Sequence, residues 1–163
     1  MKRESINIGV LAVLIFVGFS TLLLSSFKGD LVKNAIPCGD LLSMYAEKPK
    51  NLAFVKCERL KNSQTKVRAN YRVSGEQSKP VEDFLVERYG MGALRWVCCG
   101  WETMGKSGGF EHEALTKIDP YLSAGVDMFA SGEVDKDQIG EVKLESDRNK
   151  IEFFTVVVEL SIV

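Results

Sequence analysis

The feature that most constrains this chain is an uncharged, strongly apolar run near its first residue. Residues 6–24 carry no ionisable side chain, and the short segment before them contributes Lys2 and Arg3. About twenty helical residues span the ~30 Å hydrocarbon core of a bilayer. The run therefore predicts a transmembrane helix, and the positive-inside rule places Lys2 and Arg3 in the cytoplasm and the later residues outside it.

The length and the exit of this run favour an uncleaved anchor over a cleaved signal peptide. A cleavable signal has an apolar stretch of about 7–15 residues and ends in small residues of the A-x-A type. This run is longer and exits through Leu-Ser-Ser-Phe. We interpret residues 1–26 as a membrane anchor or signal segment, 27–36 as a linker and 37–163 as one exported domain, with cleavage as the alternative.

The charge of the exported part excludes a strongly basic nucleic-acid binder. Residues 27–100 hold 13 basic and 8 acidic side chains, whereas residues 101–163 hold 6 basic and 13 acidic ones. Binding to nucleic acid relies on many Lys and Arg contacts with phosphates, for which this balance leaves no surplus. The uneven distribution along the chain could steer a charged partner, or it could cancel between two faces of the folded domain.

Hydrophobic periodicity predicts a small α+β domain with a mainly antiparallel sheet and two helices. Apolar residues recur at helical spacing in 38–46 and again from Pro80 to Gly90. Alternation of apolar and polar residues predicts a hairpin of strands 52–60 and 66–73, and later strands at 93–99, 121–130, 139–144 and 151–162. Two early helices and a late run of strands are typical of α+β folds.

All four cysteines lie in the exported part, where an even number of cysteines predicts disulfides. They are Cys38, Cys57, Cys98 and Cys99. Adjacent Cα atoms are 3.8 Å apart, below the usual disulfide span of about 4.4–6.8 Å, so a bond between Cys98 and Cys99 is not expected. Either Cys38 and Cys57 each join one of the adjacent pair, or a single Cys38–Cys57 bridge leaves the neighbours reduced.

Strand phase favours the first of these arrangements. If 53–58 and 94–99 are both strands, Cys57 and Cys98 point toward the core. The preferred pairing is therefore Cys57 with Cys98 and Cys38 with Cys99. Metal binding is the second choice, but no C-x-x-C pair is present and the spacing resembles no zinc site.

Residues 100–107 match the phosphate-binding motif G-x-x-x-x-G-K-[ST] and follow a predicted strand. A working phosphate loop must open a helix, whose N-terminus faces the phosphates. Here Ser107 is followed by Gly108 and Gly109, and Pro120 comes soon afterwards. We interpret the segment as a Gly-rich surface loop and expect no nucleotide binding.

His112 is the only histidine, and it lies between Glu111 and Glu113. A histidine beside carboxylates could act as a general base or a metal ligand. A single histidine in a polar stretch is more typical of the surface, and a Cys–His pair with Cys98 or Cys99 would need a free thiolate. We therefore expect no enzymatic activity and no cofactor.

Several short stretches together resemble the bacterial domain of unknown function 4952 family, from about Pro37 to the last residue. They are Pro-Cys-Gly-Asp-Leu-Leu (37–42), Lys-Pro-Lys-Asn-Leu (48–52), Phe-Val-Lys-Cys (54–57), Tyr-Arg-Val (71–73) with Gly75, Val-Glu-Asp-Phe-Leu (81–85) and Leu-Arg-Trp-Val-Cys-Cys-Gly-Trp-Glu (94–102). The resemblance implies a small exported or anchored one-domain protein. It implies no activity and supplies no catalytic residues.

We expect a domain anchored in the bacterial inner membrane through residues 6–24, facing the periplasm and binding another protein. By analogy, an immunity or inhibitor protein that neutralises a periplasmic toxin or hydrolase fits this description. The alternatives are an accessory subunit of an envelope or secretion complex and a small hydrolase using His112. The binding candidates are Trp101, Glu102 and Lys106, because an aromatic anchor in a Gly-rich loop suits an interface.

Overall fold

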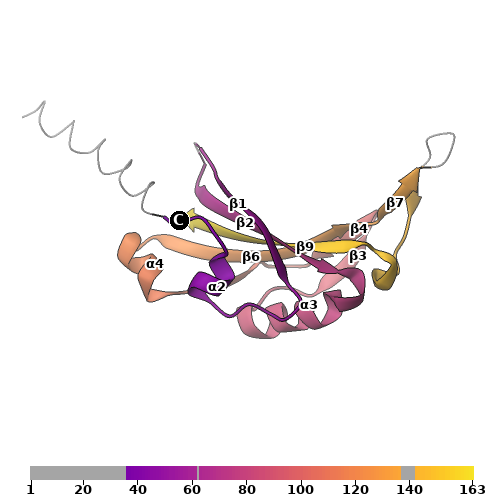
Figure 1. Cartoon of the computed structure of the whole chain (residues 1–163), viewed down its shortest axis with the longest axis horizontal. Helices are drawn as coiled ribbons and strands as arrows, with labels where there is room; N and C mark the ends of the chain where they lie inside the picture. The colour runs from indigo at the N-terminus through magenta and orange to yellow at the C-terminus, as the bar shows by residue number, and fades with distance from the viewer. Residues whose placement is uncertain (1–35, 62, 137–141) are drawn as a thin grey trace, which may run out of the picture. The chain divides into compact units, whose positions relative to one another are not determined.

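The computed structural model describes residues 36–61, 63–136 and 142–163 (Figure 1). In chain order, the elements are α2 (Leu41–Tyr45), β1 (Ala53–Arg59), β2 (Thr65–Ser74), α3 (Gly75–Tyr89), β3 (Leu94–Val97), β4 (Gly100–Thr103), β5 (Gly108–Phe110), α4 (Glu113–Ile118), β6 (Leu122–Ser131), β7 (Glu133–Lys136), β8 (Val142–Leu144), the 3-10 helix η1 (Arg148–Lys150) and β9 (Phe153–Ile162).

Within the described residues, seven strands form one antiparallel sheet. Its order is β1-β2-β9-β6-β4-β3, and β5 pairs with β6 beyond the end of β4. The strands β7 and β8 form a separate two-stranded ribbon. The prediction of a small, mainly antiparallel α+β domain is therefore confirmed.

One face of the sheet forms the hydrophobic core, and α3 packs along this face (Figure 1). Every second side chain of β2, β6 and β9 is buried, as expected for strands with one covered face. The buried strand residues meet Val81 and Leu85 of α3 and Leu41 and Leu42 of α2 in one cluster. The opposite face carries the alternate side chains of the same strands.

The short helix α2 is fixed by a buried tyrosine and a capping aspartate. The hydroxyl of Tyr71, on β2, accepts a hydrogen bond from the backbone N of Leu42 at 3.0 Å. Asp40 caps the helix by accepting from the backbone N of Ser43 at 3.2 Å, and it pairs with Lys48 at 2.6 Å. Burial raises the pKa of the Asp40 carboxyl, but the hydrogen bonds from Lys48 and Ser43 outweigh it, so this pKa lies below its usual value.

Helix α3 begins five residues earlier than the sequence predicts, so that Pro80 lies inside the helix rather than at its start. The first turn is fixed by close packing, because a side chain at Gly75 would clash with the backbone oxygens of Arg148 and Ile151. Tertiary contact therefore overrides the usual preference for proline at the first helical position. The helix ends as predicted at Gly90, which has a left-handed φ of 68°.

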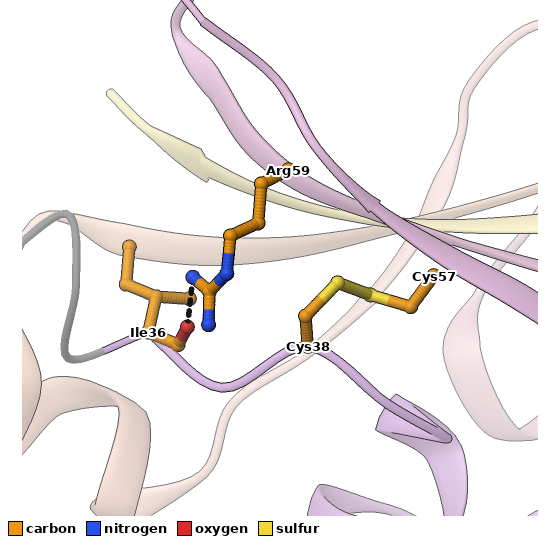
Figure 2. Close-up of a disulfide and its surroundings, with 4 residues drawn as sticks. All are labelled: Ile36, Cys38, Cys57 and Arg59. Atoms are coloured by element: carbon orange, nitrogen blue, oxygen red, sulfur yellow. Dashed lines mark hydrogen bonds between the residues drawn. A yellow bond between two sulfur atoms is a disulfide. The ribbon is translucent and has the colours of Figure 1, made fainter.

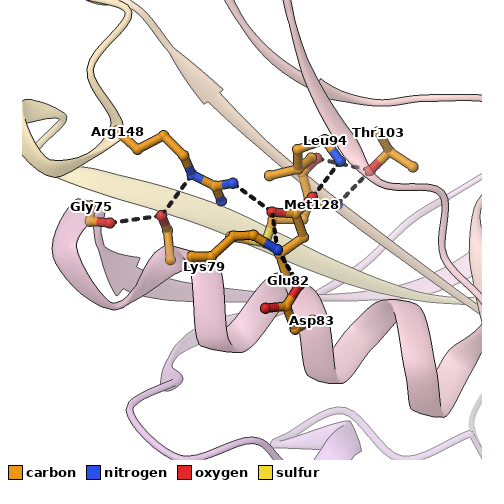
Figure 3. Close-up of polar contacts among 9 residues, drawn as sticks. Gly75, Lys79, Glu82, Asp83, Leu94, Thr103, Met128 and Arg148 are labelled. Carbon is orange, nitrogen blue, oxygen red and sulfur yellow. Dashed lines mark hydrogen bonds and ion pairs between the residues drawn. The ribbon is translucent and has the colours of Figure 1, made fainter.

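A buried carboxylate joins α3 to β3 and η1 (Figure 3). Glu82 is only 3% exposed. It accepts a hydrogen bond from the backbone N of Leu94 at 2.6 Å and pairs with Arg148 Nη1 at 2.5 Å. Arg148 also donates from Nε to Ser78 at 3.1 Å. This network holds the helix against the β3 end of the sheet.

The predicted strand 93–99 is shorter than expected. It is the strand β3, which turns at Cys98 and Cys99 and returns as β4 within the predicted Gly-rich loop. Two further elements in this part of the chain, β5 and α4, were not predicted. Of the predicted strand 139–144, only β8 lies within the described residues.

The predicted pairing of Cys57 with Cys98 and of Cys38 with Cys99 is wrong. Cys38 bonds to Cys57, with Cα atoms 5.6 Å apart (Figure 2). Cys98 bonds to Cys99. Cys57 does face the core side, opposite Ala69 of β2, but Cys98 lies in a turn instead of a strand and does not approach it. The single Cys38–Cys57 bridge was one of the two alternatives, but the expectation that Cys98 and Cys99 do not bond to each other is also wrong.

Among the residues that the structure describes, no helix has the length and apolar character needed to cross a bilayer. The predicted anchor at 1–26, with its apolar run at 6–24, and the linker up to residue 35 lie outside the described residues. The unit described here begins at Ile36 and runs to Val163.

Candidate functional site

The face of the sheet opposite α3 contains a groove of about 860 Å³, which we call the open-face groove. Strand register explains which side chains reach it, because residues directly opposite one another in an antiparallel pair share a face. Asn70 is opposite Val157, Val157 is opposite Asp127, and Phe129 is opposite Glu102. The groove therefore crosses β2, β9, β6 and β4.

Apolar side chains lie in the groove where polar ones would be expected on an uncovered face. Phe129 is 44% exposed and Val97 is 40% exposed. Both line the groove together with the half-buried Val157. Exposed apolar groups gathered in a concave surface are typical of binding sites for proteins or other ligands.

The charged side chains of the groove leave a surplus of carboxylates. Arg68 is paired with Glu159 through Nε and Nη2, each 2.6 Å from the same carboxylate oxygen. Asp127 accepts a hydrogen bond from the Ser107 hydroxyl at 2.7 Å. Glu102 makes no ion pair with any described residue. With Arg68 neutralised by Glu159, the groove presents two further acidic groups.

Asn70 supplies an unused hydrogen-bond donor in the same groove. Its Nδ2 atom is shielded from solvent and has no hydrogen-bond partner within the described residues. Buried polar atoms of this kind are rare, because an unpaired donor loses the hydrogen bonds it would make in water. Because the atom is shielded, it is not presented to an approaching partner.

One end of the groove is formed by the turn between β3 and β4. Both Cys98 and Cys99 line the groove and are exposed. Cys98 has a left-handed φ of 52°, a conformation that non-glycine residues rarely adopt. The turn is held to β6 and β7 by a hydrogen bond from the Gly132 N to the Cys99 O at 2.7 Å.

The three predicted binding residues are not gathered in one place. Glu102 faces the groove, opposite Phe129. Trp101 also borders the groove, but it is opposite Trp96 and Ala130 and its ring points to the helix-covered side. There the ring lies 6.5 Å from that of Phe154 and 5.0 Å from the Arg148 guanidinium. Lys106 is exposed in the loop before β5, with its Nζ near the C-cap of α3.

His112 has a structural role at the start of α4. Its Nδ1 caps the helix by accepting from the backbone N of Ala114 at 3.1 Å, and its ring packs edge-on against Tyr45 at 5.3 Å. It does not line the open-face groove. Among the residues that the structure describes, no group of three or more His, Cys, Asp or Glu side chains is placed to hold a metal ion.

The segment that matches the phosphate-loop motif has a different local structure. Residues 100–103 form β4, and the strand β5 begins at Gly108, directly after Ser107. A phosphate loop requires a helix at this point, with its N-terminal amides directed at the phosphates.

Sequence reasoning missed most of the groove residues, although one signal was present. In 122–131 the apolar face is Leu122, Ala124, Val126, Met128 and Ala130, so Phe129 falls on the face that is otherwise small or polar. This large aromatic residue was the one local signal for an unusual side chain on that face. Arg68 and Glu159, which are distant in sequence, give no comparable local signal.

The comparison with protein families supports the resemblance found in the sequence. The model of the domain of unknown function family DUF4952 matches residues 29–101. This part of the chain belongs to that family. The match begins before Pro37 and ends at Trp101, so it includes β1, β2, α3, β3 and the start of β4, but not β6 or β9. The resemblance expected to reach the last residue is therefore found only up to Trp101.

A search of curated proteins and a search of solved structures each found no match to this chain.

Proposed function

We propose that this DUF4952 domain is a protein-binding module that uses the open-face groove, and that it acts as an immunity or inhibitor protein in the periplasm. The observation that carries the proposal is the combination of exposed Phe129 and Val97 with the unpaired carboxylate of Glu102 in one concave surface. An apolar anchor point bordered by polar groups is the usual composition of a protein interface.

The chemistry of the groove indicates the kind of partner. The acidic surplus at Asp127 and Glu102 is complementary to a Lys or Arg side chain, and Phe129 offers a contact for an apolar or planar neighbour. We therefore expect a partner surface with a basic residue beside an apolar one.

The cellular setting of the proposal comes from the apolar run 6–24 and the cysteines. A domain tethered to the outer surface of the inner membrane would meet toxins or hydrolases as they arrive in the periplasm. Membrane attachment also confines the domain near the bilayer, which raises its effective concentration toward a partner that acts there.

Photo-crosslinking in cells tests the binding surface. A photoreactive amino acid at position 129, in the groove, should give a protein adduct, whereas the same residue at position 121 should not. Tyr121 is the matched control because it precedes the same strand, β6, and is 66% exposed. Adducts from 121 but not from 129 would contradict the proposed surface.

Affinity measurements with the identified partner then test the groove chemistry. We expect Phe129→Ala and Glu102→Lys each to weaken binding at least about tenfold, because central contacts dominate interface energies. Tyr121→Ala should change the affinity less than about twofold, as is usual outside an interface. Unchanged affinity in both groove variants would exclude this surface as the binding site.

A further inference from the structure

The turn between β3 and β4 contains a disulfide between neighbouring residues. Cys98 and Cys99 are bonded to each other, with Cα atoms 3.8 Å apart. A bond between adjacent cysteines closes a ring of eight atoms that includes their own peptide bond. Such a bond therefore holds no distant segments together, unlike the Cys38–Cys57 bond, which spans 19 positions.

Attack on a disulfide requires access to one of its sulfur atoms. Cys98 and Cys99 are both exposed at the end of the open-face groove, whereas Cys38 and Cys57 are half-buried. Figure 2 shows the Cys38–Cys57 bond between the segment before α2 and the strand β1. Beside it, the Arg59 guanidinium donates to the Ile36 carbonyl at 2.6 Å, which holds the same two segments together.

The hairpin around Cys98 and Cys99 does not depend on the bond between their sulfur atoms. Four residue pairs join β3 to β4, from Leu94 with Thr103 to Val97 with Gly100. The Cys99 N donates to the Val97 O at 2.7 Å, and the Cys99 O accepts from Gly132. Reduction of the disulfide would therefore leave the backbone hydrogen bonds of the turn in place. The reaction needs no unfolding of the hairpin.

Cysteine is an unusual choice for this turn. The first residue of a two-residue hairpin turn often needs a positive φ, and Gly, Asn or Asp normally occupies it. Here Cys98 takes that position with a φ of 52°. Cys98 thus adopts a backbone conformation that is rare for its residue type, directly beside a second cysteine.

We propose that Cys98–Cys99 is a thiol–disulfide exchange site that reacts with dithiols while Cys38–Cys57 stays closed. One thiolate of the dithiol attacks a sulfur of the pair, forms a mixed disulfide and releases the other cysteine as a thiolate. The second thiol of the dithiol then attacks the mixed disulfide. The dithiol leaves as a disulfide, and Cys98 and Cys99 have gained two electrons and, between them, two protons.

The test is a redox titration of the full-length protein prepared without reductant. The protein is equilibrated with a series of dithiothreitol and oxidised dithiothreitol mixtures, quenched in acid, alkylated and mapped by mass spectrometry. We expect alkylation of Cys98 and Cys99 at a ratio of reduced to oxidised reagent at least about tenfold lower than for Cys38 and Cys57, which corresponds to about 30 mV for a two-electron couple.

Two variants separate the sites. A Cys38→Ser/Cys57→Ser protein should keep the midpoint of the Cys98–Cys99 pair, and a Cys98→Ser/Cys99→Ser protein should show only the later step. If the first variant does not fold, mass-spectrometric mapping of the unmodified protein still shows which disulfide is reduced first. Equal midpoints, a reversed order, or thiols at 98 and 99 that are alkylated before any reductant is added would each overturn the proposal.

Discussion

At the scale of single residues, Glu82 is a charged side chain in the buried part of the domain. It is almost fully buried, yet its carboxylate is matched by the Leu94 backbone N and by Arg148, whose own side chain is 17% exposed. Burying a charge is costly unless it is paired and hydrogen-bonded. These contacts, together with Lys79 Nζ at 3.9 Å from the carboxylate, compensate the buried charge.

We expect Glu82→Gln to destabilise the domain by about 3 kcal/mol, because removing one partner of a buried ion pair leaves the other charge unpaired. The glutamine keeps a carbonyl acceptor for the Leu94 backbone N. The loss of stability therefore measures the contribution of the Glu82 charge. Urea unfolding followed by tryptophan fluorescence measures it. The adjacent Asp83→Asn is the control: Asp83 is 62% exposed in its pair with Lys79 and should cost within about 0.5 kcal/mol. Equal effects of the two variants would argue against this interpretation.

At the scale of elements, α3 accommodates a proline in its sixth position. Pro80 is exposed, and it lacks the backbone N–H that would otherwise bond to the carbonyl four residues earlier. The helix persists because its buried face, including Val81 and Leu85, packs against the sheet. Packing in this element outweighs the intrinsic preference of its residues.

Pro80→Ala should therefore stabilise the domain by roughly 1–2 kcal/mol. The regained hydrogen bond and helix propensity are worth up to ~3 kcal/mol, and the greater freedom of the unfolded chain removes up to ~1 kcal/mol of this gain. Thermal unfolding by circular dichroism measures the change. Glu87→Ala, at an exposed position in the same helix, should have almost no effect. A lower melting temperature for Pro80→Ala would show that the proline supports the helix.

The sequence predicts those elements whose pattern is local. The alternation of apolar and polar residues predicted β1, β2, β6 and β9. Helical spacing of apolar residues, followed by Gly90, predicted the end of α3. The turn at Cys98 and Cys99 carries no Gly, Asn or Pro between its two strands, so the usual turn signals were missing. The start of α3 depends on contact between Gly75 and η1, which lie far apart in the sequence.

The candidate site was less predictable than the fold. Glu102 was predicted as a binding residue in a loop, whereas it lies on the strand β4 and lines the groove. Phe129 reaches the groove because β6 exposes its second face, and Arg68 meets Glu159 only because β2 and β9 are neighbours. Strand order in a sheet depends on pairing between distant segments, which a local pattern does not contain.

At the scale of the whole molecule, the two disulfides make different contributions to stability. Cys38–Cys57 closes a loop of 19 positions and ties the start of the described domain to an edge strand. Cys98–Cys99 restricts only a single peptide unit. Stabilisation by a disulfide grows with the length of the loop that it closes.

We expect Cys38→Ser/Cys57→Ser to lower the free energy of unfolding by about 3 kcal/mol, the loss typical for a loop of this size. Cys98→Ser/Cys99→Ser is the control and should cost much less, because its bond barely restricts the unfolded chain. Chemical denaturation under non-reducing conditions compares the two. A larger loss for the second variant would contradict the assignment of the stabilising bond.

The position of β9 in the sheet has a consequence for how the protein is made. β9 is last among the described strands in chain order, yet it lies between β2 and β6 and pairs with both along most of their length. Until residues 153–162 have left the ribosome, β2 and β6 each lack the strand that pairs with them in the middle of the sheet. The hydrophobic core on that sheet cannot form before then. The complete sheet can therefore assemble only after residues 153–162 have been synthesised, so folding of this domain comes late in translation.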